Sequence, residues 1–204
     1  MAQETEIKLR VPSAAAARRL LSRHGFTVTQ PRHFERNVVL DTASSALRQQ
    51  GQLLRVRQAA GQTIITFKGP RVTGAKHKTR EELETTAGSF AALIAILERL
   101  GLRPGFQYEK CRTEFARPRE KGHAVLDETP IGTFLELEGS PAWIDRTARR
   151  LGFAASHYLL ESYGALWAAH CSRHALAPGA DFVFPAAAKK RSAGRPKKRR
   201  RPSK

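Results

Sequence analysis

Cysteine, methionine and aromatic residues are scarce in this chain of 204 residues. It has two cysteines, one methionine, two tryptophans and three tyrosines. The cysteines lie 60 positions apart at Cys111 and Cys171 and form no pair with metal-ligand spacing, which excludes a cysteine-based metal site. We therefore expect both thiols to be reduced and structural, in a cytoplasmic protein.

Long hydrophobic runs are absent as well. Hydrophobic residues make up 41% of the chain, and no run approaches the roughly 20 apolar residues that cross a bilayer. Residues 1–4 carry neither a basic start nor an apolar core, so we expect no signal peptide. These two features predict a protein with no membrane partner.

Acidic residues are few beside basic ones. The chain has 36 Lys and Arg against 18 Asp and Glu, a net charge of +18. Ten of the cations lie within 186–204, where there is no acid, and this leaves the rest of the chain at +8. A basic body fits a polyanionic ligand, although a basic surface alone would give the same balance.

The C-terminal segment 177–204 has no apolar periodicity, and its positive charges repel one another. We expect a disordered basic tail there, after a single domain at 1–176. Gly194-Arg195-Pro196, flanked by cations, resembles a minor-groove AT-hook peptide. A contact with nucleic acid or polyphosphate and a plain solubility tail are both compatible with this composition.

Apolar periodicity divides the domain into strands and amphipathic helices. Pro31 is expected to break one strand into two pieces, and Ser13 and Gly25 to cap and end the first helix. We expect helices at 13–24, 89–100, 141–151 and 159–171. The strands are expected at 4–11, 27–30, 33–41, 52–58, 63–68, 80–85, 108–116, 122–128 and 133–138.

Pairs of charged residues at a spacing of two recur in these strands, opposite an apolar face. The pairs are Glu4 with Glu6, Lys8 with Arg10, Arg55 with Arg57, Glu82 with Glu84, Lys110 with Arg112, and Glu136 with Glu138. Two arrangements account for the pattern. An antiparallel sheet closed into a wide barrel would point the charges into a wet interior. A sheet with helices on one side and water on the other would show the same alternation.

The first strand joins two kinds of chemistry on one face. Glu4 and Glu6 are adjacent carboxylates, which suit a hard divalent cation. Lys8 follows them and suits phosphate oxygens held by the same metal. A solvated outer face of a surface strand is the simpler interpretation of this segment taken alone.

Several segments resemble the CYTH family in the family's own order. This family comprises the class IV adenylate cyclases, the thiamine triphosphatases and the inorganic triphosphatases, which are grouped as triphosphate tunnel metalloenzymes. The matching segments are Glu4-x-Glu6-x-Lys8, Leu40-Asp41-Thr42, Leu54-Arg55-Val56-Arg57, Phe67-Lys68-Gly69-Pro70, Arg80-Glu81-Glu82-Leu83-Glu84, Glu109-Lys110-x-Arg112, Leu126-Asp127, Phe134-x-Glu136-x-Glu138 and Ser162-Tyr163. Together they cover about residues 3–168.

The resemblance implies an α+β fold, an eight-stranded antiparallel β-barrel or tunnel with flanking helices. It implies Mg²⁺ or Mn²⁺ as the cofactor and a triphosphate-containing small molecule as the substrate. The implied metal ligands are Glu4, Glu6, Asp127, Glu136 and Glu138, assisted by Glu82 or Glu84. The implied substrate ligands are Lys8, Arg55, Arg57, Lys68, Lys110 and Arg112. The implied catalytic residues are Glu4, Glu6, Lys8 and Glu138.

Two positions depart from the family pattern. Glu161 stands where many members carry a Lys or Arg that reaches the phosphates, so that contact is expected either to be missing or to be supplied by Arg10 or a cation of the 71–80 loop. The His-Phe pair that precedes the first strand in class IV cyclases is missing before Glu4.

Three functions remain open at this stage. A metal-dependent triphosphate hydrolase is the first, a class IV adenylate cyclase that makes cyclic AMP and pyrophosphate is the second, and a polyphosphate- or nucleic-acid-binding module without turnover is the third. A monomer and a homodimer are equally compatible with the sequence.

Overall fold

The computed structural model of the protein describes residues 2–72, 76–176 and 181–185. Eight strands lie within them: β1 (Ala2–Val11), β2 (Thr27–Thr42), β3 (Leu53–Ala59), β4 (Gln62–Lys68), β5 (Lys78–Ala87), β6 (Leu102–Ala116), β7 (His123–Thr129) and β8 (Gly132–Glu138). The α-helices are α1 (Ala14–Arg23), α2 (Ala46–Gln49), α3 (Phe90–Arg99), α4 (Pro141–Arg150) and α5 (Tyr163–Arg173).

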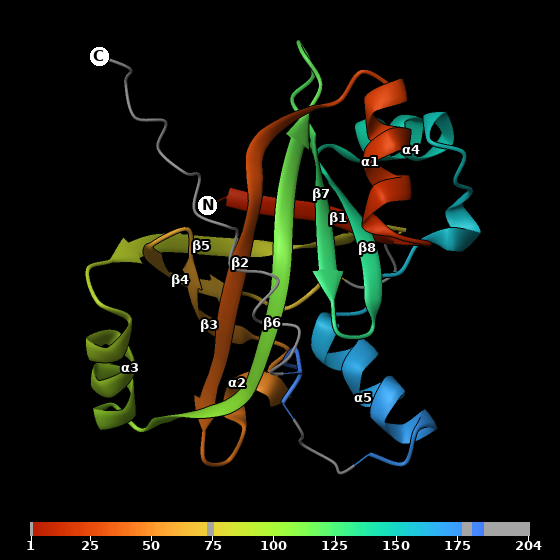
Figure 1. Ribbon diagram of the computed structural model, residues 1–204. Helices are drawn as coiled ribbons and strands as arrows, with labels where there is room; N and C mark the ends of the chain where they lie inside the picture. The colour runs from red at the N-terminus through yellow and green to blue at the C-terminus, as the bar shows by residue number, and fades with distance from the viewer. Residues whose placement is uncertain (1, 73–75, 177–180, 186–204) are drawn as a thin grey trace, which may run out of the picture.

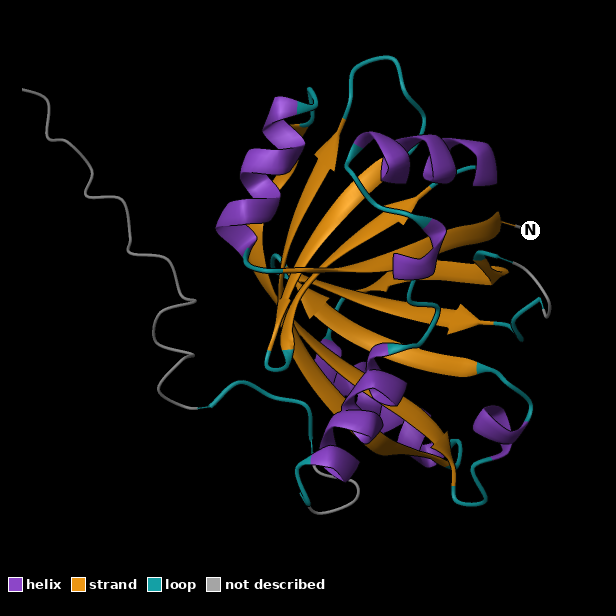
Figure 2. Cartoon of the chain, turned by 90° about the vertical axis from the view of Figure 1, so that its right-hand side faces the viewer, coloured by secondary structure: helices purple, strands orange, loops and turns teal. Residues whose placement is uncertain are grey.

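The strands form one closed barrel in the order β1-β5-β4-β3-β2-β6-β7-β8, with β8 pairing back onto β1. All neighbouring strands are antiparallel. In Figure 2 the strands fan out from one side of the barrel, and helices lie above and below them. This confirms the expected eight-stranded barrel with flanking helices, and the open sheet is not formed.

The hydrophobic core lies outside the barrel, between the strands and the helices. One cluster joins Ile7 and Leu137 of neighbouring strands to Leu21 of α1 and Ile144 of α4. A second cluster joins Val38 and Val56 to the apolar face of α3. Figure 1 shows α1 and α4 together beside β8, and α3 on the opposite side of the barrel. Most apolar strand residues therefore point outward and leave most inward positions to charged residues.

Each of the five α-helices in the described residues begins directly after a serine. Ser45 before α2 makes no side-chain cap bond, but each of the other four serines accepts at its Oγ a hydrogen bond from the backbone N–H three residues later, a cap worth about 1 kcal/mol. The pairs are Ser13 with Ala16, Ser89 with Ala92, Ser140 with Trp143, and Ser162 with Ala165. The cap expected at Ser13 is confirmed.

Four elements differ in their boundaries from the sequence-based expectations. β2 runs unbroken past Pro31, because register shifts on both sides of Gln30 absorb the proline as a bulge. β6 begins at Leu102 rather than 108, and β5 at Lys78 rather than 80. The last helix begins at Tyr163 rather than 159, since residue 159 instead pairs with Lys8 of β1.

The expected end of the ordered domain at 176 also differs from the structure. Residues 181–185 lie against β6, with Phe182 fully buried. The remainder of the expected tail, 177–180 and 186–204, falls outside the described residues. The helices that the structure describes are too short or too polar to cross a membrane.

Candidate functional site

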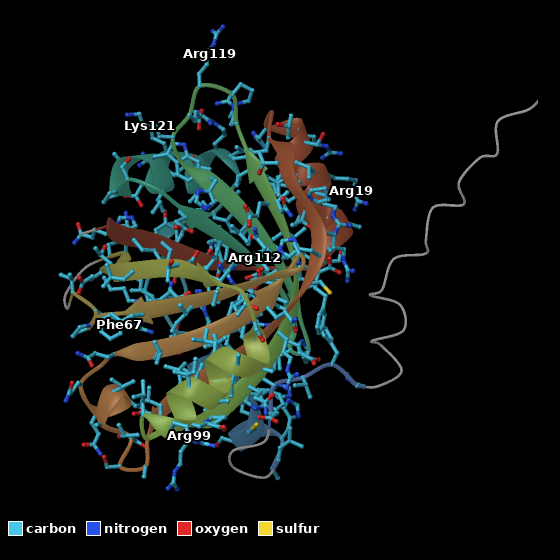
Figure 3. The ribbon with its side chains drawn as sticks, turned by 90° about the vertical axis from the view of Figure 1, so that its left-hand side faces the viewer. Arg19, Phe67, Arg99, Arg112, Arg119 and Lys121 are labelled. Atoms are coloured by element: carbon cyan, nitrogen blue, oxygen red, sulfur yellow. The ribbon has the colours of Figure 1, made fainter. Side chains whose placement is uncertain are left out.

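The inward faces of the strands bring most of the predicted charged residues together in the barrel interior, here called the lumen. Glu4, Glu6 and Lys8 come from β1, and the other strands complete the set with Arg55, Arg57, Lys68, Glu82, Glu84, Lys110, Arg112, Asp127 and Glu136. Arg112 lies in the middle of the barrel in Figure 3, whereas Arg19, Arg99 and Arg119 lie at its periphery.

Asp127 is the most enclosed acid of the lumen, with no solvent exposure. Its carboxylate accepts two bonds from Arg112, at 2.8 and 2.7 Å, and one from Lys110 Nζ at 2.8 Å. Tyr163 donates its hydroxyl to the same carboxylate at 2.9 Å. Burial alone would raise the pKa of Asp127, but Arg112 and Lys110 outweigh it and hold this pKa well below its usual range. Asp127 is therefore an anion at neutral pH.

Lys8 joins two carboxylates from neighbouring strands. Its Nζ lies 3.2 Å from Glu6 and 2.9 Å from Glu136. Lys78 also donates to Glu6, and Arg112 reaches Glu136 at 2.7 Å. Burial would raise the pKa of Glu6, but Lys8 and Lys78 hold it well below its usual range. Both acids are thus held as ions by cations that phosphate oxygens could equally bind.

Lys68 also joins two carboxylates, those of Glu4 and Glu82. Its Nζ lies 2.6 Å from Glu4 and 2.9 Å from Glu82. Burial, followed by the negative charge of Glu6, raises the pKa of Glu4, and a hydrogen bond shared with Glu82 raises it further. Two ionised carboxylates would repel each other at that contact, so Glu4 marks a place where negative charge is only partly compensated.

The arginines of β3 face two further acids, Glu84 and Glu35. Arg57 lies 3.3 Å from Glu84 and 3.5 Å from Glu35. Arg55 donates to the Tyr108 hydroxyl at 3.2 Å. Of the two alternatives for an assisting metal ligand, Glu82 therefore lies beside Glu4, and Glu84 lies with the arginines.

Glu138 is the predicted site residue that the structure sets apart. Its carboxylate pairs with His123 at 3.2 Å near the end of β8, and its side chain is 29% exposed. In the part of the chain that the structure describes, no ion pair within 4.0 Å links Glu138 to the lumen cations. Its predicted catalytic and metal-binding roles stay predictions.

Several lumen residues were not predicted from the sequence. Glu35 is 1% exposed and lies within 3.5 Å of Lys110. Lys78 and Arg80 share the inward face of Glu82, and the expected start of the strand at 80 left Lys78 out of it. Both are buried, whereas Glu161 is exposed, and the expectation that a cation of the 71–80 loop compensates for Glu161 stays a prediction. Arg10, the other expected substitute, shares the face of Lys8 but is exposed, with its guanidinium against the Phe134 ring and donating to the Ile131 carbonyl.

The donor set fits a hard divalent cation by type, because carboxylate oxygens are the preferred ligands of Mg²⁺ and Mn²⁺. The under-compensated Glu4, next to Glu6 and Glu82, supports that fit. In residues 2–72, 76–176 and 181–185, however, no three His, Cys, Asp or Glu side chains converge at metal-binding distance. The carboxylate oxygens pair with lysine and arginine nitrogens instead.

Comparison with known proteins agrees with this architecture. A model of the CYTH domain family matches residues 2–146. A Methanocaldococcus jannaschii protein, provisionally named an adenylate cyclase, is 27% identical over 137 residues, which are 67% of this chain and 77% of that protein.

Two solved structures share the fold. One from Vibrio parahaemolyticus, titled provisionally as an adenylate cyclase, has a TM-score of 0.70 at 21% identity and covers 80% of this chain and 97% of its own. One from Hippeastrum, a provisional adenylyl cyclase whose title reports a dominant triphosphatase activity, has a TM-score of 0.56 at 20% identity. It covers 85% of this chain and 97% of its own.

Proposed function

Because this chain belongs to the CYTH domain family, we propose that it is a divalent-metal-dependent hydrolase that cleaves triphosphates inside its barrel. The proposed substrate is inorganic tripolyphosphate or an organic triphosphate such as thiamine triphosphate or a nucleotide. One observation carries the proposal: each lumen cation forms an ion pair with a carboxylate. A polyphosphate can replace the carboxylates as the partner of the cations, and a divalent ion can replace the cations as the partner of the carboxylates.

The exchange follows from the cost of buried charge. Removing one partner of a buried ion pair leaves an uncompensated ion, which costs about 3–5 kcal/mol. If phosphate oxygens take Lys8, Lys68 and Arg112, the carboxylates lose their partners. Divalent metal ions bound at those carboxylates would restore the charge balance. We propose Glu4, Glu6, Asp127, Glu136 and Glu138 as the ligands of Mg²⁺ or Mn²⁺, with Glu82 assisting.

The basic side chains have different tasks in this proposal. Phosphoryl transfer depends mainly on positioning and charge neutralisation. The planar guanidinium groups of Arg57 and Arg112 can each donate two parallel N–H bonds, whereas Lys8 and Lys110 act as point charges. The bound metal would supply further neutralisation at the phosphate oxygens and would acidify an attacking water. The enclosing strands limit the access of other water to the phosphates.

The experiment that tests this proposal compares substrates in one assay. The protein is incubated with tripolyphosphate, thiamine triphosphate or ATP, each with Mg²⁺, Mn²⁺ or a chelator. We expect orthophosphate release that requires the metal. Binding of tripolyphosphate without any turnover would leave the third function, a binding module, and would overturn the hydrolase.

A class IV adenylate cyclase is the second candidate, because the provisional names of the Methanocaldococcus and Vibrio proteins assign that activity to them. The same lumen would then hold ATP, and a ribose hydroxyl of the bound ATP would attack the α-phosphorus of that ATP. The products separate the candidates: cyclic AMP with pyrophosphate identifies a cyclase, and orthophosphate from tripolyphosphate identifies a hydrolase.

We also propose a cytoplasmic location, which agrees with the free, buried thiols of Cys111 and Cys171. The expected contact of the basic tail with nucleic acid or polyphosphate concerns residues 186–204, outside the described part of the chain. The choice between monomer and homodimer is left to a measurement of mass in solution.

A further inference from the structure

The short segment 181–185 adds a strand-like edge to β6. β7 pairs with β6 only from Cys111 onward, so residues 107–109 extend past the β7–β8 hairpin. Phe182 fills that edge: its N–H donates to the Gln107 carbonyl at 2.9 Å, and its carbonyl accepts from Glu109 N–H at 2.9 Å. The Phe184 N–H donates to the Glu109 carboxylate at 3.0 Å. The segment is therefore held by directed hydrogen bonds as well as by apolar contact.

The side chain of Phe182 enters an aromatic cluster at this end of the barrel. It has no solvent exposure, and its ring stacks on Trp167 of α5 with centroids 5.0 Å apart. Its centroid lies 6.4 Å from that of Tyr163, which in turn lies 6.3 Å from that of Tyr108. Figure 1 shows α5 below β7 and β8, at the end of the barrel where this segment returns.

Both tyrosines of the cluster contact charged residues of the lumen. The Tyr108 hydroxyl accepts a hydrogen bond from Arg55, and the Tyr163 hydroxyl donates one to Asp127. The Tyr163 ring also lies 5.1 Å from Lys8 Nζ and 5.3 Å from Lys110 Nζ. A displacement of either ring would thus move the groups that hold an arginine and a carboxylate of the site.

We propose that Phe182 is a positioning residue of the triphosphate site, which acts through Tyr108 and Tyr163 on Arg55 and Asp127. Phe182 touches no phosphate, and the inference rests on the proposed function for the identity of the ligand. Small displacements in such a site carry large effects, because a misplacement of about 1 Å can cost about a hundredfold in rate. Deleting the C-terminal segment is accordingly expected to harm the site.

The test uses the full chain with Phe182→Leu, which keeps an apolar side chain in the cluster but removes the stacked ring. Val183→Ala is the matched control, because Val183 is the next residue and is 37% exposed. Binding of tripolyphosphate is measured by calorimetry with Ca²⁺, a divalent ion that carboxylate oxygens also bind, in place of Mg²⁺ or Mn²⁺, at a temperature where circular dichroism shows every variant folded. We expect the dissociation constant to rise about tenfold in Phe182→Leu, a loss of about 1.4 kcal/mol, and to stay unchanged in Val183→Ala.

A double-mutant cycle separates positioning from general packing. Tyr163→Phe removes the hydroxyl that Phe182 is proposed to place. In the Tyr163→Phe background, the factor by which Phe182→Leu raises the dissociation constant should be at least threefold smaller than in the unmodified chain. The reason is that the Tyr163 hydroxyl, through which Phe182 is proposed to act, is already absent. Fully additive losses would overturn the inference. Equal binding by the unmodified chain and Phe182→Leu would overturn it as well.

The two proposals fail in different ways. An unmodified chain that binds tripolyphosphate but releases no orthophosphate from any triphosphate contradicts the hydrolase and leaves the Phe182 comparison intact. An unmodified chain that turns substrate over while Phe182→Leu binds equally well contradicts the positioning role alone.

Discussion

At the scale of single residues, Arg112 shows how one side chain serves two carboxylates. Its guanidinium reaches both oxygens of Asp127 and one of Glu136. A lysine in its place would keep the charge but lose the planar fork. The arrangement of these bonds matters as much as the number of charges.

We expect Arg112→Lys to weaken tripolyphosphate binding about ten- to a hundredfold, because it loses at least one charged hydrogen bond worth about 1.5–3 kcal/mol. Calorimetric titration measures the change. Arg99→Lys is the matched control, since Arg99 lies at the periphery on α3. Equal affinity of the two variants would remove Arg112 from the proposed substrate site.

Glu136→Gln is expected to lower metal-dependent turnover at least a hundredfold, because it removes a proposed metal ligand while Lys8 keeps Glu6 as a partner. Steady-state orthophosphate release over a range of Mn²⁺ concentrations measures the loss. Glu138→Gln belongs in the same series as a test of its predicted role. Glu98→Gln, exposed on α3, should behave like the unmodified chain. Normal turnover in Glu136→Gln would contradict the proposed ligand set.

Asp145 couples stability to pH outside the lumen. It accepts hydrogen bonds from Lys76, His77 and Tyr158, at 3.0, 2.9 and 3.0 Å. Burial alone would raise the pKa of Asp145, but these bonds lower it to about 2 from an ordinary value of 3.8. A lowered pKa in the folded state gives stability that is present above 3.8 and is lost as the pH falls toward 2.

Asp145→Asn should therefore lower the free energy of unfolding at pH 7, and the gap to the unmodified chain should close between pH 4 and pH 2. Urea unfolding at a series of pH values measures it. A gap that stays constant down to pH 2.5 would show that the charge of Asp145 adds nothing.

At the scale of elements, the packing of α4 against the barrel depends on a glycine. Gly122 precedes β7, and a methyl group at that position would overlap the ring of Trp143 on α4. Trp143 is 5% exposed, and its indole N–H donates to Glu120 at 2.6 Å, so its ring has little freedom to move. The absence of a side chain at Gly122 lets the helix dock.

Gly122→Ala is expected to cost about 1–3 kcal/mol of unfolding free energy, the usual range for overpacking. Chemical denaturation measures the loss. Gly88→Ala provides the control, because a methyl group there meets no atom within 4 Å. Comparable stability of the two variants would mean that α4 shifts freely on the barrel.

At the scale of the whole molecule, the barrel keeps opposite charges in one enclosed volume. The eight lumen cations described above face seven carboxylates, so their charges nearly cancel without a ligand. The lumen cations are Lys8, Arg55, Arg57, Lys68, Lys78, Arg80, Lys110 and Arg112, and the acids are Glu4, Glu6, Glu35, Glu82, Glu84, Asp127 and Glu136.

A triphosphate that enters with a divalent ion should stabilise the folded state by mass action. At about 100 times its dissociation constant the gain is about 2.7 kcal/mol, which corresponds to a rise of about 5–10 °C in Tm for a domain of this size. Differential scanning fluorimetry with tripolyphosphate and Mn²⁺ measures the rise, and orthophosphate alone is the control. A Tm that does not respond to tripolyphosphate would contradict binding in the lumen.

The sequence by itself determined which residues share one face of each strand, because side chains alternate along a strand whatever its partners are. It thus placed Glu4, Lys8 and Arg55 on charged faces, and serines such as Ser13 at helix starts. Its resemblance to a family added the barrel, which alternation alone left open.

Only the tertiary structure decided how those faces meet. Closure of the sheet paired Lys8 with Glu136 and Lys68 with Glu4 across strands far apart in the chain, which no local spacing encodes. It also placed Tyr163 and Phe182 at the lumen, because segments after the last strand dock on edges that exist only once the barrel has formed. Local periodicity reports the face of a residue, and long-range packing chooses its partner.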